Sequence, residues 1–198
     1  SCLGYIVLAK IVQIVTGQSL DVAARERCWD PLSLTSFTYK PTGIVAPTRS
    51  LEGPEGHPVE LIGIVHDGNA RGIAAGGTGD VSGNAGCFGT ARDVAAFGCA
   101  VLSGSWLGMP LSKRWLTDQS QPAGHSLALF AGANPLVPKG ELFGDGAVGH
   151  SGYTGTALLL VPEVDTVIAL CTNAVYADKD AFLIHRRRIM NVIAGNLN

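Results

Sequence analysis

Charge is scarce in this chain of 198 residues and nearly balanced in sign. Charged residues make up 15% of the sequence, and the formal net charge is −2. A nucleic-acid-binding domain needs clustered basic residues, so this class is excluded. Hydrophobic residues make up 46% of the chain, which excludes an intrinsically disordered protein. The sequence therefore describes a globular protein, long enough for a single domain with a sizeable core.

Long apolar runs are also absent. The longest one is much too short to cross a bilayer, so we expect no membrane span. The first residues, from Ser1 to Tyr5, contain neither an initiator Met nor the basic segment that opens a signal peptide. We therefore expect a processed chain or a fragment of a longer one.

Cysteines are few, and their spacing does not match a metal clip. Their number is odd, and His57, His125 and His185 also lack a partner at metal spacing. The sequence therefore predicts no metal and no other cofactor. We expect mostly buried free thiols, which favours a reducing compartment such as the cytoplasm. The five cysteines are Cys2, Cys28, Cys87, Cys99 and Cys171.

Helical periodicity marks both ends of the chain. Apolar residues recur at helical spacing over 3–16, and Gly17 follows as a C-cap. A second helix is predicted from a cap at Ser19 to about Trp29. The last helix is predicted over 178–195, where apolar residues again share one face.

The middle of the chain is less regular. Proline, glycine, serine and threonine over 33–60 predict an excursion across the surface. A helix is predicted after Thr90, with Val94, Phe97, Val101 and Leu102 on its buried face and an end at Ser103-Gly104. Ser112 is the predicted cap of a short helix that holds Trp115.

A glycine-rich polar turn leads into the clearest strand pattern. Residues 149–155 read Gly-His-Ser-Gly-Tyr-Thr-Gly, and apolar runs follow over 156–161 and 166–172. Two such runs across a short polar turn predict an antiparallel hairpin, and 126–130 is predicted as a further strand. Glycine in a strand is expected where a backbone or a ligand approaches closely. Residues 149–155 are therefore the predicted wall of a site.

This order of elements predicts the fold class. Helices come first, three strands follow, and a helix closes the chain, as in an α/β (α+β) protein with an antiparallel sheet flanked by helices. We expect one domain over 1–198. Residues 1–120 are predicted to be mostly helices and loops, and 121–198 to hold the strands and the C-terminal helix.

His150-Ser151-Gly152 resembles the third motif of the serine β-lactamase and penicillin-binding-protein superfamily. That strand motif is usually Lys-Thr-Gly, and the branch close to class C β-lactamases and their esterase relatives often has His-x-Gly. The run from His66 to Phe88 is similar to the same branch, and we expect it to line one side of a cleft. The resemblance implies a β-lactamase/transpeptidase-like fold, of which this chain is the C-terminal part.

A further similarity lies at the start of the chain. The sequence from Ser1 to Tyr5 lines up with the family's Tyr-x-Asn motif from the residue after the Tyr, which puts Cys2 at the position of the Asn. A thiol cannot offer the paired donor and acceptor of an amide. The resemblance thus implies that Cys2 occupies a catalytic position with its usual role in doubt.

The reaction that the resemblance implies is acyl transfer through a Ser ester. Its substrate would be a small ester, a β-lactam or a D-amino-acid peptide. The family's nucleophile lies in Ser-x-x-Lys, but no lysine of this chain has a serine three residues before it. We therefore expect the nucleophile upstream of Ser1, and no acyl-enzyme from this chain alone.

The resemblance also assigns roles to the motif. The backbone N–H of Tyr153 would form half of the oxyanion hole, and His150 would hydrogen-bond the nucleophile's network or carry a proton. Ser151, Gly152 and Thr154 would bind the substrate, with Gly152 leaving room for it on the strand.

Several alternatives remain open. Residues 149–152 faintly resemble a Gly-x-Ser-x-Gly nucleophile elbow, but the strand follows the Ser instead of preceding it. A chain without the nucleophile also fits an inactive homologue that binds a peptide or acyl ligand, or acts as a scaffold. His150 on its own fits a half-buried turn residue, and His66-Asp67 fits a pair that bonds local backbone. An isolated fragment is expected to expose apolar surface and to self-associate.

Overall fold

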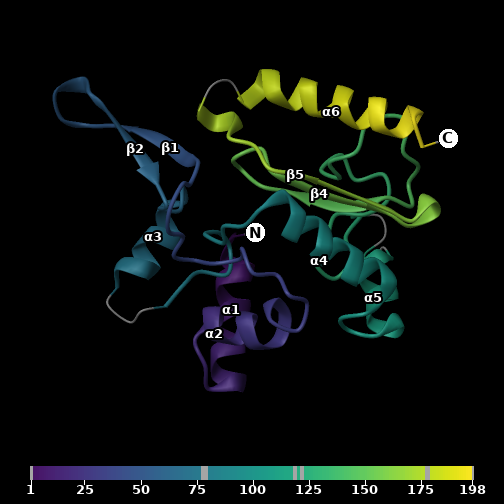
Figure 1. Cartoon of the computed structure of the whole chain (residues 1–198), viewed down its shortest axis with the longest axis horizontal. Coiled ribbons are helices and arrows are strands. Elements are labelled where there is room, and N and C mark those ends of the chain that lie inside the picture. Colours follow the sequence, from purple (N-terminus) through teal and green to yellow (C-terminus); the bar gives the residue numbers. More distant parts are fainter. Residues whose placement is uncertain (1, 77–79, 118–119, 121–122, 177–178, 198) are drawn as a thin grey trace. The chain divides into compact units, whose positions relative to one another are not determined.

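The structure, a computed structural model, describes residues 2–76, 80–117, 120, 123–176 and 179–197. The chain falls into two compact units, Ser1–Thr90 and Ala91–Asn198, which are considered separately (Figure 1). The two units meet at residue 90, whereas the predicted description of 1–120 and 121–198 concerned the kinds of element within one domain. That the two units form one domain stays a prediction.

The first unit opens with two helical segments, as predicted. Helix α1 (Cys2–Thr16) ends where Gly17 takes a φ of 69°, and the Gly17 N–H donates to Gln13 O at 2.9 Å. Helix α2 (Leu20–Ala24) runs on into the π-helical turn η1 (Arg25–Trp29). Ser19 stands at the N-cap of α2, but its hydroxyl donates to Asp21 Oδ1 at 2.6 Å and caps no backbone N–H. The predicted cap is therefore wrong.

A hairpin occupies much of the stretch predicted as an irregular surface excursion. Strands β1 (Pro47–Glu52) and β2 (Pro58–Ile62) pair antiparallel around the 3-10 turn η2 (Pro54–Gly56). Helix α3 (Gly68–Ala75) follows, and Asp67 caps it by accepting the Ala70 N–H at 2.9 Å. The local bonding predicted for Asp67 is thus confirmed, whereas the sequence pattern missed the hairpin.

The second unit is built on the predicted antiparallel hairpin. Strands β3 (Val148–Ser151), β4 (Ala157–Val161) and β5 (Thr166–Leu170) form a sheet in that order, with every pair antiparallel. The 3-10 turn η3 (Pro162–Val164) joins β4 to β5. Strand β3 therefore lies at one edge of the sheet.

Helices cover both faces of this sheet (Figure 1). Helices α4 (Ala91–Ser103) and α5 (Met109–Leu116) cover one face, and α6 (Lys179–Gly195) covers the other. Successive β4 side chains alternate between them: Leu160 joins the cluster around Val101, and Leu159 the cluster around Met190. Leu159, Leu160 and Met190 are fully buried. The predicted helices over 91–103 and 179–195 are confirmed, and the predicted first residue, Asp178, lies outside the described residues.

Two local predictions in this unit are wrong. Ser126–Phe130 is not a strand, because Ser126 and Leu129 close a tight turn through an N–H to carbonyl bond of 2.9 Å. Ser112 is not a cap, because α5 begins at Met109, and Pro110 is well suited to a first helical turn. Ser112 lies inside the helix and is fully buried.

The cysteines are less buried than predicted. All five are free, and only Cys28 is partly buried while the other four are exposed. Within the described residues, no single helix is long and apolar enough to cross a membrane. The bent pair formed by α1 and the segment Leu20–Trp29, with 80° between its halves, passes that test by length and composition only.

Candidate functional site

The predicted site residues lie on β3 and on the turn that follows it. His150 faces Leu158 of β4 in the register of the sheet, and Ser151 faces Ala157. The turn is closed by two main-chain bonds, from Gly152 N–H to Thr156 O at 2.8 Å and from Gly155 N–H to Gly152 O at 3.1 Å. The site is therefore a strand edge that ends in a rigid turn.

Two glycines of this motif have structural reasons to be there. Gly155 has a φ of 98°, and a Cβ on it would lie 2.7 Å from Ala174 Cβ and 3.0 Å from Phe182 Cε1. A Cβ on Gly152 would meet the hydroxyl oxygen of Thr156 well inside van der Waals contact. Close neighbours surround both glycines, but they are side-chain atoms of the protein, whereas a backbone or a ligand was expected. That Gly152 also leaves room for a substrate stays a prediction.

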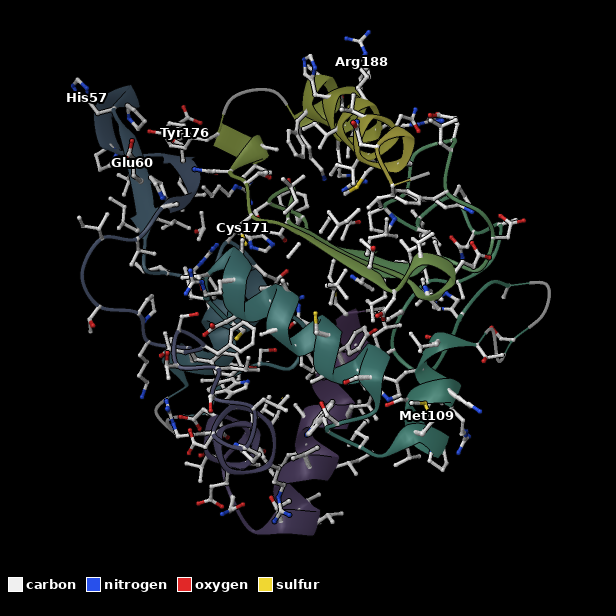
Figure 2. The ribbon with its side chains drawn as sticks, turned by 45° about the vertical axis from the view of Figure 1, so that its right-hand side comes forward. His57, Glu60, Met109, Cys171, Tyr176 and Arg188 are labelled. Atoms are coloured by element: carbon white, nitrogen blue, oxygen red, sulfur yellow. The ribbon has the colours of Figure 1, made fainter. Side chains whose placement is uncertain are left out.

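The segment after β5 holds the turn in place. Thr154 O accepts the Ala174 N–H at 2.8 Å and the Thr172 hydroxyl at 3.3 Å. Figure 2 shows Cys171 at the end of β5, where this segment begins. The Thr154 carbonyl therefore anchors the turn to the segment that follows β5.

The main chain of β3 alternates between its two sides. Gly149 bonds outward to Phe130, through N–O distances of 2.8 Å and 2.9 Å, while Gly152 N–H bonds inward to Thr156 O. Because N–H and C=O groups of a strand alternate in direction, those of Ser151 face the same outer edge as those of Gly149. The open part of this edge thus begins beyond Phe130.

His150 is half-buried beside an aromatic ring. Its imidazole stacks on Phe130, with ring centroids 4.8 Å apart and planes inclined by 16°, and His125 contacts the same phenyl ring at 4.8 Å. Burial lowers the pKa of His150, a hydrogen bond to the Ser151 main chain raises it, and His125 lowers it again. The net pKa is below the ordinary value of 6.5. His150 is therefore neutral at pH 7 and able to accept a proton.

Tyr153 presents its ring to a cation. Its side chain is 49% exposed, and Lys179 Nζ of α6 lies 3.9 Å from the ring centroid. A cation at this distance over a tyrosine face is attracted by the ring's quadrupole. Lys179 thereby puts a positive charge at the turn.

Five of the six predicted residues, 150–154, are contiguous in the second unit. The sixth, Cys2, is in the first unit, where it is the exposed first residue of α1. The run 66–88, predicted to line a cleft, is also in the first unit, and residues 77–79 of it lie outside the described residues. These roles stay predictions.

Sequence reasoning missed the residues that support the motif. Phe130, Thr172 and Lys179 reach it only through the fold, and no spacing rule connects them with residues 150–153. An aromatic residue at the end of the predicted strand 126–130 was the one available signal for Phe130.

The second unit also contains a surface depression away from the His150 motif. A shallow depression of about 410 Å³ lies where β3 begins, lined by Leu116, Ala131, Asp145 and Val148 among others. Within the part of the chain that the structure describes, no three His, Cys, Asp or Glu side chains gather as metal ligands.

The sequence is similar to a known family profile and to curated proteins. The sequence profile of the beta-lactamase family matches residues 1–189. A protein of Escherichia coli K12, provisionally named a D-alanyl-D-alanine carboxypeptidase, is 27% identical over 187 residues, or 85% of this chain and 43% of the relative. The N-acetylmuramyl-L-alanine amidase of Bacillus subtilis strain 168 is 30% identical over 195 residues, or 87% of this chain and 43% of the relative. The chain spans less than half the length of these curated relatives.

Solved structures share the fold. A β-lactamase from Mycobacterium bovis matches with a TM-score of 0.70 and 16% identity, over 100% of this chain and 63% of the other. A simvastatin synthase variant from Aspergillus terreus matches with a TM-score of 0.69 and 13% identity, over 97% and 55%. These likenesses confirm the predicted β-lactamase/transpeptidase-like fold, of which the chain covers a part. With the family profile matched over 1–189 and the fold matched over the whole chain, this protein belongs to the beta-lactamase family.

Proposed function

We propose that this chain supplies one wall of a serine hydrolase site of the β-lactamase, DD-peptidase and esterase type. In that reaction a serine attacks a carbonyl, and the acyl group passes through a Ser ester to water. The observation that carries the proposal is the edge strand β3, which presents a half-buried, neutral His150 beside a rigid turn. The nucleophile comes from residues outside 1–198, because no Ser-x-x-Lys occurs within them.

The Tyr153 N–H is the proposed half of the oxyanion hole. The outward bonds of Gly149 support this role, because they show that the outer edge of β3 runs up to the turn that contains Tyr153. Removal of one such donor typically costs roughly 3–4 kcal/mol of barrier. The anchoring of Thr154 by Ala174 and Thr172 keeps this donor in place before substrate arrives.

The other motif residues have proposed roles beside it. His150 accepts the proton of the serine, which requires a neutral imidazole, and the imidazolium so formed can then donate that proton. The Ser151 hydroxyl and the Thr154 side chain bind the substrate's carbonyl or carboxylate, and Gly152 leaves space for the chain that lies along the strand. Cys2 stands at the family's amide position and contributes at most a weak hydrogen bond there.

The proposed substrate is a small ester, a β-lactam or a D-amino-acid peptide. His150-Ser151-Gly152 favours the branch near class C β-lactamases and esterases. The names of the matched relatives, a carboxypeptidase and an amidase, favour a peptide-type amide. Both kinds of substrate contain a carbonyl for the oxyanion hole, so one site plan serves them.

The test uses nitrocefin and a p-nitrophenyl ester with two proteins, the 198-residue chain and the complete gene product that contains it. We expect an acyl-enzyme burst from the complete product and none from the chain alone. His150→Ala in the complete product should lower the burst rate by about 10²–10⁴, the range of a general base. A burst from the chain alone would overturn the assignment of the nucleophile.

A second candidate is a catalytically inactive homologue that binds a peptide or acyl ligand, or acts as a scaffold. Cys2 at the amide position favours it, because the exposed thiol replaces a catalytic hydrogen-bonding group. Under this alternative the complete product binds a labelled penicillin reversibly and gives no burst. A covalent adduct that survives denaturation would exclude it.

A further inference from the structure

Phe130 lies at the outer edge of β3 without belonging to a helix or strand. Its N–H donates to Gly149 O at 2.8 Å, and the Gly149 N–H donates back to Phe130 O at 2.9 Å. This reciprocal pair is an isolated antiparallel bridge. The main chain of Phe130 therefore closes the edge of β3 one residue before His150.

The side chain of Phe130 covers the neighbouring imidazole. Its ring lies nearly parallel to that of His150, with the centroids 4.8 Å apart and the planes inclined by 16°. The phenyl also packs against the buried cluster that contains Val137 and Phe143. Because the core holds it from behind, the phenyl ring is a fixed surface for the imidazole.

A tight turn brings a second imidazole to the same phenyl. Ser126 and Leu129 exchange main-chain and hydroxyl hydrogen bonds of 2.9–3.2 Å, and His125 and Phe130 form a bridge across this turn. The His125 ring lies 4.8 Å from the phenyl, at an angle of 53°. The phenyl ring thus contacts two imidazoles, one from its own turn and one from β3.

We propose that Phe130 is a positioning residue for His150: its main chain holds the strand edge at Gly149, and its ring sets the plane of the imidazole. The catalytic meaning of this inference rests on the proposed function, whereas the geometry can be tested without turnover. Substrate pairing along β3 is then confined to the edge beyond Phe130, next to Ser151 and the turn.

The surroundings of His150 make the consequence measurable. Leu158 faces it from β4, Phe130 covers one side, and the ionisable neighbour contributed by the 125–130 turn is His125. Burial is the first cause of its lowered pKa. Loss of the phenyl ring admits water to one face of the imidazole, so the pKa of His150 rises toward its ordinary value.

The experiment is histidine-labelled NMR of the full 198-residue chain, with the His150 signals assigned through His150→Gln. Phe130→Leu removes the ring, and Phe130→Met serves where Leu does not fold. Phe130→Tyr restores a ring. Phe143→Leu is the matched control, because it removes a phenyl from the buried cluster that Phe130 contacts.

We expect Phe130→Leu to abolish the ring-current displacement of the His150 ring protons and to raise the His150 pKa. Phe130→Tyr should retain both properties, and Phe143→Leu should retain both while lowering the melting temperature. Unchanged His150 signals in Phe130→Leu would overturn the inference, as would an equal change in Phe143→Leu. If the NMR result holds and the complete gene product gives no acyl-enzyme, the proposed function fails and this inference stands.

Discussion

The two units of this protein differ in how they bury apolar side chains. In the second unit, β4 places Leu159 and Leu160 between helices on either face of the sheet, and both are fully buried. In the first unit, α1 buries only Ala9, while Leu3, Ile14 and Val15 are 69%, 73% and 78% exposed. Helix α1 and strand β4 both lie within the span of the family profile. The comparison teaches that the same family segment contains one core closed by its own residues and one helix whose apolar face is left open.

The largest expected effect tests this contrast directly. Leu160→Ala opens a cavity in the second unit and should cost about 2–5 kcal/mol of unfolding free energy. Leu8→Ala removes the same atoms from a side chain of α1 that is 55% exposed, and should change stability by no more than about 0.5 kcal/mol. Urea unfolding followed by circular dichroism measures both. Equal losses would show that the α1 face is covered in solution, for example by self-association.

Periodicity explains which parts of the fold were predictable. Helix α1 and the β4–β5 hairpin have repeating apolar patterns with clear turn residues on each side, and the sequence predicted both. The pattern over 126–130 is too short to separate a strand from a turn. The Ser126 hydroxyl accepts the Leu129 N–H, and this bond stabilises the turn. The β1–β2 hairpin escaped because most of its side chains are partly or fully exposed, so no alternation with a buried face marks it.

The candidate site was predictable only as far as its motif extends. Residues 150–154 were named from a contiguous stretch, and the structure places them on one strand and turn. Phe130 and Lys179 reach that stretch through tertiary packing, and the only local signal for either is the aromatic side chain of Phe130 at the end of the predicted strand 126–130. The position of Cys2 came from a resemblance at the start of the chain, which belongs to the first unit.

A smaller loss of stability is expected when alanine replaces a glycine with a positive φ, and one such glycine in each unit serves the comparison. Gly155→Ala combines an unfavourable φ of 98° with contacts at 2.7 Å and 3.0 Å, and should cost about 2–4 kcal/mol. Gly17→Ala has a φ of 69° but nothing within 4 Å of its new Cβ, so only the backbone term applies, about 1–2 kcal/mol. Thermal unfolding compares the two. A larger loss at Gly17 would mean that packing around the turn of the second unit is looser than described.

The next prediction concerns the stability contributed by a helix-capping hydrogen bond in the first unit. Asp67 caps α3 in the first unit, and Asp67→Ala should cost about 1 kcal/mol. Ser19→Ala is the control, because Ser19 makes no capping bond, and its effect should stay within about 0.5 kcal/mol.

The Asp67 contribution should also depend on pH. The Ala70 N–H, as the main cause, holds the pKa of Asp67 below its ordinary value of 3.8. A carboxyl with a lowered folded-state pKa stabilises above its unfolded pKa, and this contribution is lost as the pH falls through the folded value. The difference between wild type and Asp67→Asn should therefore change only in acid. A change near pH 7 would argue against the cap as its source.

The smallest expected effect compares one cation–π pair from each unit. Lys179 Nζ lies 3.9 Å from the Tyr153 ring in the second unit, and Arg25 Cζ lies 5.5 Å from the Trp29 ring in the first. Double-mutant cycles with Lys179→Gln and Tyr153→Leu should give a coupling of about 0.5–1 kcal/mol. The cycle with Arg25→Gln and Trp29→Leu should give less, because attraction falls with distance. A stronger coupling at Arg25 would reverse the comparison, and no coupling at Lys179 would leave the Tyr153 turn held by its main chain alone.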